Sequence, residues 1–375
     1  MVRGGCFSGA DDAERRLFSS YAESLVNEAS ARAEEIRQTI PSPEFPERTD
    51  TLYIGGGTPS VLPLDVLKRM VEGVSKAVYG EENHGFTEFT IEVNPEDIIT
   101  KGLDYLEGLR RLGVNRISMG VQSFDDDILR WMNRRHDSAR VRSAFEMIRK
   151  VGFENVSLDL IYGFTGLSHE RWRETLMQAA DLAPEHISAY QLSIEEGSAL
   201  AGMIDDGRYT EPSDEYCREQ YDILCQVLAG AEYHHYEISA FARPGYEAVH
   251  NSAYWKLHPY SGLGPGAHSA VADSTGEIVQ RKWNPDSLCG CGTQEGQQYR
   301  GGQEFLSAEE RKEERIMLSL RTDKGVDASL LPEGTMRRML ELGELEYSFE
   351  GVGNRVRIPE KYLFVSDNII AALLS

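Results

Sequence analysis

The stretch that decides the expected fold is Thr51-Leu52-Tyr53-Ile54-Gly55-Gly56-Gly57-Thr58-Pro59, in which a short apolar strand runs directly into three glycines. Glycine carries no Cβ, so its backbone can approach a ligand closely and leave amide and carbonyl groups free to bind it. Pro59 then fixes the turn that follows. One glycine-rich turn is a weak signal, so the prediction depends on whether other strands of the chain end in a similar way.

Four more short apolar segments follow this strand, and most of them lead through a loop into an amphipathic helix. The expected strands are 51–54, 89–93, 116–121, 156–160 and 186–192. The expected helices are 18–40 before the first strand, then 64–78, 103–112, 138–151 and 170–182. This alternation predicts βα units, a parallel sheet and helices on its outer side.

Polar or glycine-rich residues follow every expected strand. The ends are Gly55-Gly56-Gly57-Thr58-Pro59, Glu92-Val93-Asn94-Pro95, Gly120-Val121-Gln122-Ser123, Asp159-Leu160-Ile161-Tyr162-Gly163 and Gln191-Leu192-Ser193. Glycine and proline end strands anyway, so one such end is explained by loop chemistry alone. In parallel sheets, however, the carboxyl ends of the strands build the site. Five such ends in one sheet therefore favour a shared site, and no dinucleotide or P-loop glycine motif follows any of them.

Composition narrows the classes of partner and the compartment. Among 375 residues, 39 Lys and Arg against 61 Asp and Glu give a net charge of −22, which repels nucleic acid and anionic lipid. There is no run of about 18 apolar residues, so no transmembrane segment is expected. Without an apolar signal region at the start, we expect a cytoplasmic protein. Five cysteines with no framework spacing argue against a secreted disulfide protein.

The second half of the chain indicates a different organisation. A helix is expected over 215–229, a glycine-, proline- and aromatic-rich segment over 244–269, and a loop over 289–303. A helix over 309–320 precedes residues 335–375, whose pattern of helix, short hairpin and helix predicts a small winged-helix-like module. Two cysteine pairs carry no metal prediction: Cys289 and Cys291 are too close for a C-x-x-C site, and Cys217 and Cys225 suit packing along one helix.

Four segments in fixed order carry a family resemblance. They are Thr51 to Ser60, Ile91 to Glu96, Asn115 to Phe124 and Leu158 to Gly163. From about Tyr21 to its end the chain resembles the HemW and coproporphyrinogen-oxidase-like proteins of the radical S-adenosylmethionine (SAM) superfamily. The resemblance implies an α/β fold with a partial (βα)6 TIM-type barrel that lacks its first strand, and a small C-terminal α+β, winged-helix-like domain. The implied domains are 1–205 for the barrel, 206–300 for a heme-binding extension and 301–375 for the C-terminal domain.

The resemblance also implies a set of SAM-contacting residues. They are Gly56, Gly57, Thr58, Glu92, Gln122, Arg134 and Asp159. The chemistry agrees: carboxylates suit the ammonium and hydroxyl groups of SAM, and Arg134 suits its carboxylate. Gln122 can both donate and accept hydrogen bonds. The alternative for Glu92 and Asp159 is a structural salt bridge at a strand end, and their membership of this set favours the ligand role.

A second segment, His250-Asn251-Ser252-Ala253-Tyr254-Trp255, implies heme. Its H-N-x-x-Y-W form resembles the signature that separates heme-binding HemW proteins from coproporphyrinogen dehydrogenases. The implied heme contacts are His250, Asn251, Tyr254 and Trp255, with His250 as the iron ligand and with His268 and His258 as the next choices. Imidazole is a common axial ligand, and aromatic rings pack well on a porphyrin. The alternative is a core histidine packed against two aromatics.

One element of the family is missing from the sequence. The family holds a [4Fe–4S] cluster through a C-x3-C-x2-C loop, whereas Cys6 is the one cysteine in that region of this chain. Cys6 is predicted to be a metal ligand, although one thiolate cannot hold a cubane cluster. The joint absence of the first strand and the cysteines favours a truncated start over a cluster-free descendant.

The resemblance implies a heme chaperone that binds heme and delivers it to acceptor proteins such as respiratory cytochromes, with SAM and a [4Fe–4S] cluster as cofactors of the complete family. The alternative is an oxygen-independent coproporphyrinogen III oxidase-like oxidoreductase of porphyrin biosynthesis, and a third hypothesis is an inert remnant. Whether the chain is an enzyme stays open, as do peripheral membrane association and a homodimer.

Overall fold

The computed structural model describes residues 8–82, 84–286, 301–348 and 354–375. Its main sheet has seven strands in the order β1-β2-β3-β4-β5-β7-β6. The parallel strands are β1 (Thr51–Ile54), β2 (Glu88–Val93), β3 (Arg116–Gln122), β4 (Val156–Tyr162) and β5 (His186–Gln191). Two short strands continue the sheet in antiparallel pairing, β7 (Ala240–Ala242) beside β5 and β6 (His234–Glu237) at the edge. The five strands expected from the sequence are confirmed, each with bounds within two residues of those expected.

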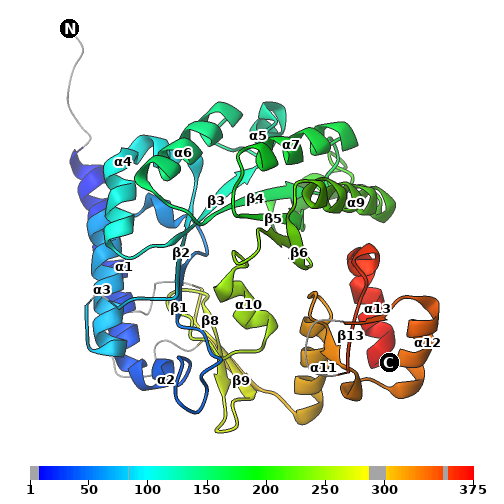
Figure 1. The fold of residues 1–375 in the computed structure, drawn as a ribbon. Helices are drawn as coiled ribbons and strands as arrows, with labels where there is room; N and C mark the ends of the chain where they lie inside the picture. The colour runs from blue at the N-terminus through cyan, green and yellow to red at the C-terminus, as the bar shows by residue number, and fades with distance from the viewer. Residues whose placement is uncertain (1–7, 83, 287–300, 349–353) are drawn as a thin grey trace.

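Helices cover the outer side of this sheet (Figure 1). In chain order the larger ones are α3 (Leu64–Tyr79), α4 (Pro95–Arg111), α6 (Ser138–Val151), α7 (His169–Asp181) and α9 (Asp214–Gly230). Shorter helices are α5 (Asp126–Trp131) and α8 (Ala199–Asp205). The expected α/β class, with a parallel sheet and helices on its outer side, is confirmed. Among the described residues no strand pairs with the free side of β1, so the sheet forms a partial barrel.

Helix α6 illustrates why the sequence folds this way. The Asp137 side chain accepts a hydrogen bond from the Arg140 N–H at 2.9 Å and caps the first turn. At the other end Gly152 adopts a left-handed φ of 91°, which ends the helix. Apolar residues three or four apart face the sheet and are buried: Val141, Ala144, Phe145 and Ile148. Local capping thus determines the ends of the helix, and one apolar stripe determines which face packs on the sheet.

The strands alternate between an apolar and a polar face. Side chains that point toward the helices form the core, among them Phe89, Ile91, Ile117, Met119, Leu158, Leu160 and Ile187. The alternate positions point into the barrel and are buried yet polar: Glu88, Thr90, Arg116, Ser118, Ser157, His186 and Ser188. Buried polar groups require partners, so the interior of this barrel is a hydrogen-bonded network rather than an apolar plug.

Two smaller sheets complete the structure. The antiparallel order β10-β9-β8 is formed by β8 (His268–Ala272), β9 (Ile278–Trp283) and β10 (Gly302–Phe305). The order β11-β13-β12 is formed by β11 (Val326–Asp327), β13 (Arg355–Arg357) and β12 (Glu346–Tyr347). Around the latter lie α11 (Ala308–Ser319), α12 (Glu333–Leu342) and α13 (Ser366–Leu374). The antiparallel pairing of β12 with β13 confirms the hairpin expected near the end of the chain.

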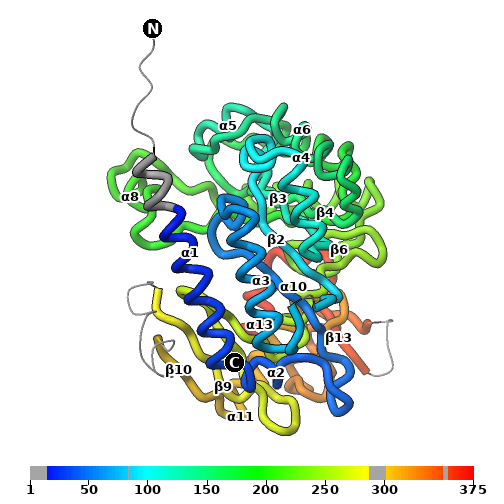
Figure 2. Tube along the Cα trace, turned by 90° about the vertical axis from the view of Figure 1, so that its left-hand side faces the viewer, coloured from blue at the N-terminus to red at the C-terminus, as the bar shows by residue number. Residues whose placement is uncertain are grey.

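The N-terminal helices tie the barrel to the β10-β9-β8 sheet. Helix α1 (Ser8–Ala31) runs beside α3 and meets this sheet at its far end (Figure 2). Arg32 makes the junction, because its guanidinium donates to Glu28 Oε1 at 2.7 Å, to the Gly262 carbonyl at 2.8 Å and to Ser269 Oγ at 2.9 Å. This multiply bonded arginine joins segments more than 200 residues apart in the sequence.

Three expectations need correction. The single helix expected over 18–40 is two helices, since α1 ends at Ala31 and α2 (Ala33–Arg37) follows it. The helix expected over 103–112 is only the second part of α4, which begins at Pro95 and contains a non-helical residue at Gly102. For the segment 244–269 the sequence predicted no element, and the structure forms α10 (Val249–Trp255) and the start of β8 there. Helix α10 has seven residues, too short for a clear apolar period, and its first amides are held by a carboxylate from β2. Domain boundaries at 205 and 300 stay predictions.

Some expectations fall outside the described residues. Cys6, Cys289 and Cys291 belong to the ranges 1–7 and 287–300, about which the structure says nothing. Within the ranges that are described, no helix combines the length and apolar character needed to cross a bilayer.

Candidate functional site: a cavity at the strand ends

A cavity of about 380 Å³ opens at the carboxyl ends of the parallel strands. Six of the seven residues predicted to contact SAM line it: Gly57, Thr58, Glu92, Gln122, Arg134 and Asp159. The seventh, Gly56, is adjacent, and its N–H donates a hydrogen bond to Glu92 Oε2 at 3.2 Å. Residues that are far apart in the sequence therefore meet in one place, although their role as SAM contacts stays a prediction.

The triple-glycine turn forms one wall of this cavity. Gly56 and Gly57 have φ angles of 77° and 150°, which side chains disfavour, and a Cβ on either would meet nothing within 4 Å. At Gly55, in contrast, a Cβ would lie 2.4 Å from the Tyr53 ring and 2.6 Å from Glu92 Oε1. The turn therefore requires glycine at 56 and 57 for its backbone angles and at 55 for space, and it leaves open room in front of the backbone.

Two carboxylates lie at the floor of the cavity. Tyr53 donates its hydroxyl hydrogen to Glu92 Oε1 at 2.7 Å, which fixes that side chain. Ser118 donates to Asp159, with its Oγ 2.9 Å from one carboxylate oxygen and 3.2 Å from the other. Burial raises the pKa of Asp159 to about 6, and Glu92 pushes the same way while Ser118 and Arg116 oppose it. A cationic or hydroxyl-bearing ligand would relieve this burial penalty.

Gln122 occupies a strained position at the end of β3. Its φ is 66°, an unusual value for a residue with a side chain, and the register between β3 and β4 shifts between Gly120 and Gln122. A bulge of this kind re-aims the side chain that follows it. A left-handed backbone at a residue with a side chain costs about 1–3 kcal/mol and needs support from its surroundings.

Arg134 supplies a cation that forms no ion pair with a described residue. It follows α5, lines the cavity and is half-buried, and its guanidinium bonds no described residue. The next residue differs, since Arg135 pairs with Glu96 at 3.0 Å and with Asp97 at 3.4 Å. Burial lowers the pKa of Arg134, with Glu96 opposing the shift. A half-buried guanidinium with free donors is suited to an anionic group, above all a carboxylate.

The predicted heme residues all lie on or beside α10, but they face two directions. His250 points to the barrel edge, where Nδ1 is 2.7 Å from Thr51 Oγ1, Nε2 is 2.8 Å from Tyr254 Oη, and the ring stacks on Tyr53 with centroids 5.0 Å apart. Burial lowers the pKa of His250 to about 4, so the ring is neutral at physiological pH. Both of its nitrogens are engaged, and iron ligation would require one hydroxyl to leave.

The other three predicted heme residues differ in their surroundings. Tyr254 is 38% exposed and packs edge-on against Tyr260, with centroids 4.7 Å apart. Asn251 is half-buried, and Trp255 lines a second, larger cavity on the far side of the helix. The H-N-x-x-Y-W segment therefore forms a helix with one face on β1 and another on this second cavity. The assignment of these residues to heme stays a prediction.

The sequence reasoning missed the polar floor of the barrel. Ser157 Oγ lies 2.8 Å from His186 Nδ1, and His186 Nε2 lies 2.8 Å from Tyr236 Oη, which accepts a hydrogen bond from the Ala248 N–H. Arg116 is 2% exposed, and its buried Nε has no hydrogen-bond partner among the described residues. Burial, with Arg116 adding to it, holds the pKa of His186 well below its usual value. The regular placement of polar residues at every second strand position was the available signal.

Metal-binding groups are sparse in the described part of the chain. Cys225, His235 and Glu360 offer ligand atoms within 4.8 Å of one another. A hydrogen-bond contact of 3.0 Å between His235 Nδ1 and Glu360 Oε1 already accounts for this cluster, and burial raises the pKa of the Cys225 thiol to about 12. The described cysteines, Cys217 and Cys225, both lie on α9, and neither lines the strand-end cavity. The described residues thus do not supply three thiolates for an iron–sulfur cluster.

Comparisons with known proteins identify the family of the chain. The family described as the radical SAM superfamily matches residues 17–179. A protein of Bacillus subtilis (strain 168), named heme chaperone HemW, is 33% identical over 305 residues, which cover 81% of this chain and 78% of that protein. The heme chaperone HemW of Lactococcus lactis is 32% identical over 310 residues, 82% of this chain and 75% of that protein.

A solved structure shows the same fold at lower identity. Coproporphyrinogen III oxidase (HemN) from Escherichia coli, described as a radical SAM enzyme, matches with a TM-score of 0.72 at 21% identity and covers 96% of this chain and 83% of its own. Its likeness extends over both the barrel and the C-terminal elements. Since the relatives with 32–33% identity span most of both chains, this chain belongs to the HemW family of the radical SAM superfamily.

Proposed function

We propose that the chain binds heme and delivers it to acceptor proteins, and that its strand-end cavity holds SAM. The support for heme is the name of its relatives, heme chaperone HemW, together with the H-N-x-x-Y-W helix beside the barrel. The likeness to coproporphyrinogen III oxidase is one of fold at 21% identity, so it does not favour an oxidase.

The observation that carries the SAM half of the proposal is the unpartnered Arg134 in a cavity with two fixed carboxylates. In this proposal Arg134 binds the carboxylate of SAM, and Glu92 and Asp159 take its ammonium and ribose hydroxyl groups. The open backbone of Gly56 and Gly57 leaves space for the ligand to lie against the turn.

SAM bound in this way supplies radical chemistry when a reduced iron–sulfur cluster lies beside it. Cys6 remains the proposed contributor to such a cluster, and it lies outside the described residues. The role derived for this chain's own residues is therefore limited to binding and orienting SAM.

Heme binding and transfer are tested in two steps. Addition of ferric heme to the purified chain should produce a Soret band that saturates near one equivalent. On mixing with a heme-free acceptor cytochrome, the band of the chain should fall as that of the cytochrome rises. A heme complex that never releases heme would support a binding protein but contradict delivery, and the absence of any saturable band would end the proposal.

A further inference from the structure

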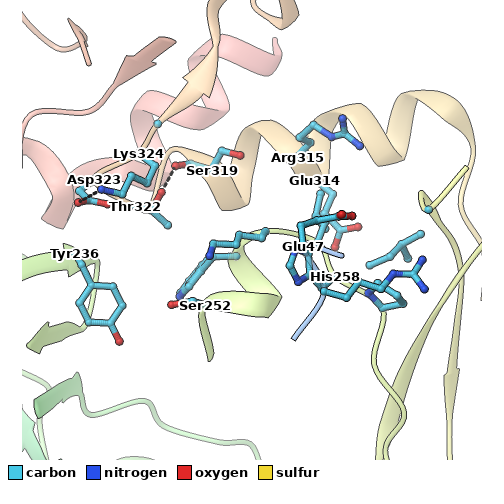
Figure 3. Close-up of a pocket in the computed structure, with 18 of the residues that line it drawn as sticks. Glu47, Tyr236, Ser252, His258, Glu314, Arg315, Ser319, Thr322, Asp323 and Lys324 are labelled. Atoms are coloured by element: carbon cyan, nitrogen blue, oxygen red, sulfur yellow. Dashed lines mark hydrogen bonds and ion pairs between the residues drawn. The ribbon is translucent and has the colours of Figure 1, made fainter. Parts of the chain in front are cut away.

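A second cavity, of about 610 Å³, lies between α10, the β8–β9 hairpin and α11, and its size is typical of sites for cofactor-sized ligands. Figure 3 shows Glu314, Arg315 and Ser319 of α11 opposite Ser252 of α10, with Tyr236 at the barrel side. Trp255, the last residue of the H-N-x-x-Y-W segment, also lines it. The cavity is larger than the one at the strand ends and is separate from it.

His258 gives this cavity a free imidazole. It follows α10, where its N–H bonds the Ala253 carbonyl at 2.9 Å, and it lines the cavity. Its ring nitrogens bond no described residue, and Nδ1 is buried. Burial lowers the pKa of His258, with Lys256 and Arg48 adding to the shift and Glu47 opposing it, so the ring is neutral at physiological pH. A neutral imidazole with an uncommitted lone pair can bind iron.

The other histidines nearby are already engaged. His234, which also lines the cavity, has Nε2 3.2 Å from Asp323 Oδ2. His250 bonds Thr51 and Tyr254 through its two nitrogens on the opposite side of α10. Of the two histidines that line this cavity, His258 is therefore the one ready to bind a metal without breaking a contact.

The walls suit a planar molecule that carries carboxylates. The Trp255 indole, Leu257, Pro259 and Ile278 supply apolar surface. In a chain of net charge −22, the lining has more cations than anions: Arg48, Lys256, Arg311, Arg315, Lys324 and Arg355 against Glu47, Glu247, Glu277, Glu314 and Asp323. Lys256, at the exposed rim, forms no ion pair with a described residue, and Arg311 and Arg315 share the single carboxylate of Glu277.

We infer that this second cavity is the heme site, with His258 as the axial iron ligand and with Lys256 and Arg311 as partners of the propionate carboxylates. The inference rests on the proposed function, because it presumes that the chain binds heme. His250 then becomes a positioning residue, which fixes α10 to β1 so that Trp255 and the segment through His258 face the cavity.

The first test is a ferric-heme titration of the full chain followed by absorbance. Wild type should give a histidine-ligated Soret band. His258→Gly should lose that band and bind at least about tenfold more weakly, and added imidazole should restore the spectrum. His169→Gly, at a histidine of α7 that does not line the cavity, is the control and should behave as wild type. His250→Gln should keep the band position.

The second test concerns the residues proposed to bind the propionates, and it separates a loss of carboxylate contacts from a loss of folding. Lys256→Glu/Arg311→Glu should weaken heme binding at least about tenfold and leave binding of heme dimethyl ester, which has no free carboxylates, nearly unchanged. An equal loss for both compounds would overturn the carboxylate assignment. A wild-type spectrum in His258→Gly, or loss of histidine ligation in His250→Gln alone, would overturn the site while leaving heme binding intact. No saturable binding by wild type would instead refute the proposed function itself.

Discussion

The Tyr53 hydroxyl donates a 2.7 Å hydrogen bond to Glu92 and so joins the strand that carries the triple glycine to its neighbour at the floor of the cavity. Burial and the nearby carboxylates raise the pKa of Tyr53 far above its ordinary value, so the phenol stays a donor at any physiological pH. Two donors, the Tyr53 hydroxyl and the Gly56 N–H, therefore fix the orientation of the Glu92 carboxylate. The remaining lone pairs of this carboxylate can accept hydrogen bonds from a ligand.

Replacement of Arg134 should weaken SAM binding without changing the fold. Arg134→Ala removes the unpartnered cation, and the loss of charge-assisted hydrogen bonds worth about 1.5–3 kcal/mol should weaken SAM binding roughly 10- to 100-fold. Isothermal titration calorimetry provides the measurement. Binding of 5′-methylthioadenosine, which lacks the amino-acid end, should not change.

Arg135→Ala is the matched control, because its guanidinium is already paired with Glu96 and Asp97. It should leave SAM affinity as in wild type. Equal losses in the two variants would show that Arg134 does not contact the carboxylate of SAM.

Two glycines with almost the same backbone test the role of the turn. Gly56 has a φ of 77° and Gly80, at the end of α3, a φ of 80°, and neither would place a Cβ within 4 Å of another atom. Each Gly→Ala change should lower the free energy of unfolding by about 1 kcal/mol through backbone strain. Only Gly56→Ala should also weaken SAM binding. Unimpaired SAM binding by Gly56→Ala would remove the turn from the site.

Asp159 should destabilise the fold at neutral pH. Its folded pKa of about 6 exceeds the ordinary value of 3.8, so the folded state holds the proton more tightly and stability falls as pH rises between these values. Asp159→Asn should therefore match wild type below about pH 4 and exceed it by roughly 1–3 kcal/mol above pH 6. Urea denaturation at several pH values measures this difference, and SAM binding should be lost in the same variant.

His250 should give the opposite pH dependence of folding stability. Its folded pKa of about 4 lies below the ordinary 6.5, so the unfolded state binds protons more readily and stability is lost as pH falls through this range. Replacement by glutamine, which does not titrate, should flatten the decline by up to about 3 kcal/mol. An unchanged slope between pH 6.5 and 4 in His250→Gln would mean that the ring is solvated rather than enclosed by Thr51, Tyr53 and Tyr254.

The sequence predicted those features whose signal lies within one short segment of the chain. The strand ends were predictable because a parallel sheet brings its carboxyl ends to one edge, so that Glu92, Gln122 and Asp159 had to converge. Arg134 has no local signal of its own, and the family resemblance alone pointed to it. The polar alternation of the strands was visible but was not recognised as a buried network.

The rest depended on contacts between distant segments. Helix α10 is short and depends on Glu88, from a strand about 160 residues earlier, which accepts bonds from the Val249 and His250 amides at 2.8 and 3.1 Å. The second cavity draws its walls from segments near residues 47, 255, 277 and 315. No periodicity or spacing within one segment could predict that these four would meet.

Strand β2 has one further consequence. Glu92 at its carboxyl end lines the strand-end cavity, and Glu88, four residues earlier on the same face, anchors the helix beside the second cavity. A rise of about 3.3 Å per residue puts these two carboxylates roughly 13 Å apart on a rigid rod. If a ligand at one end shifted β2, it would move the carboxylate at the other end as well, and by thermodynamic reciprocity each ligand would then change the affinity of the other by the same factor.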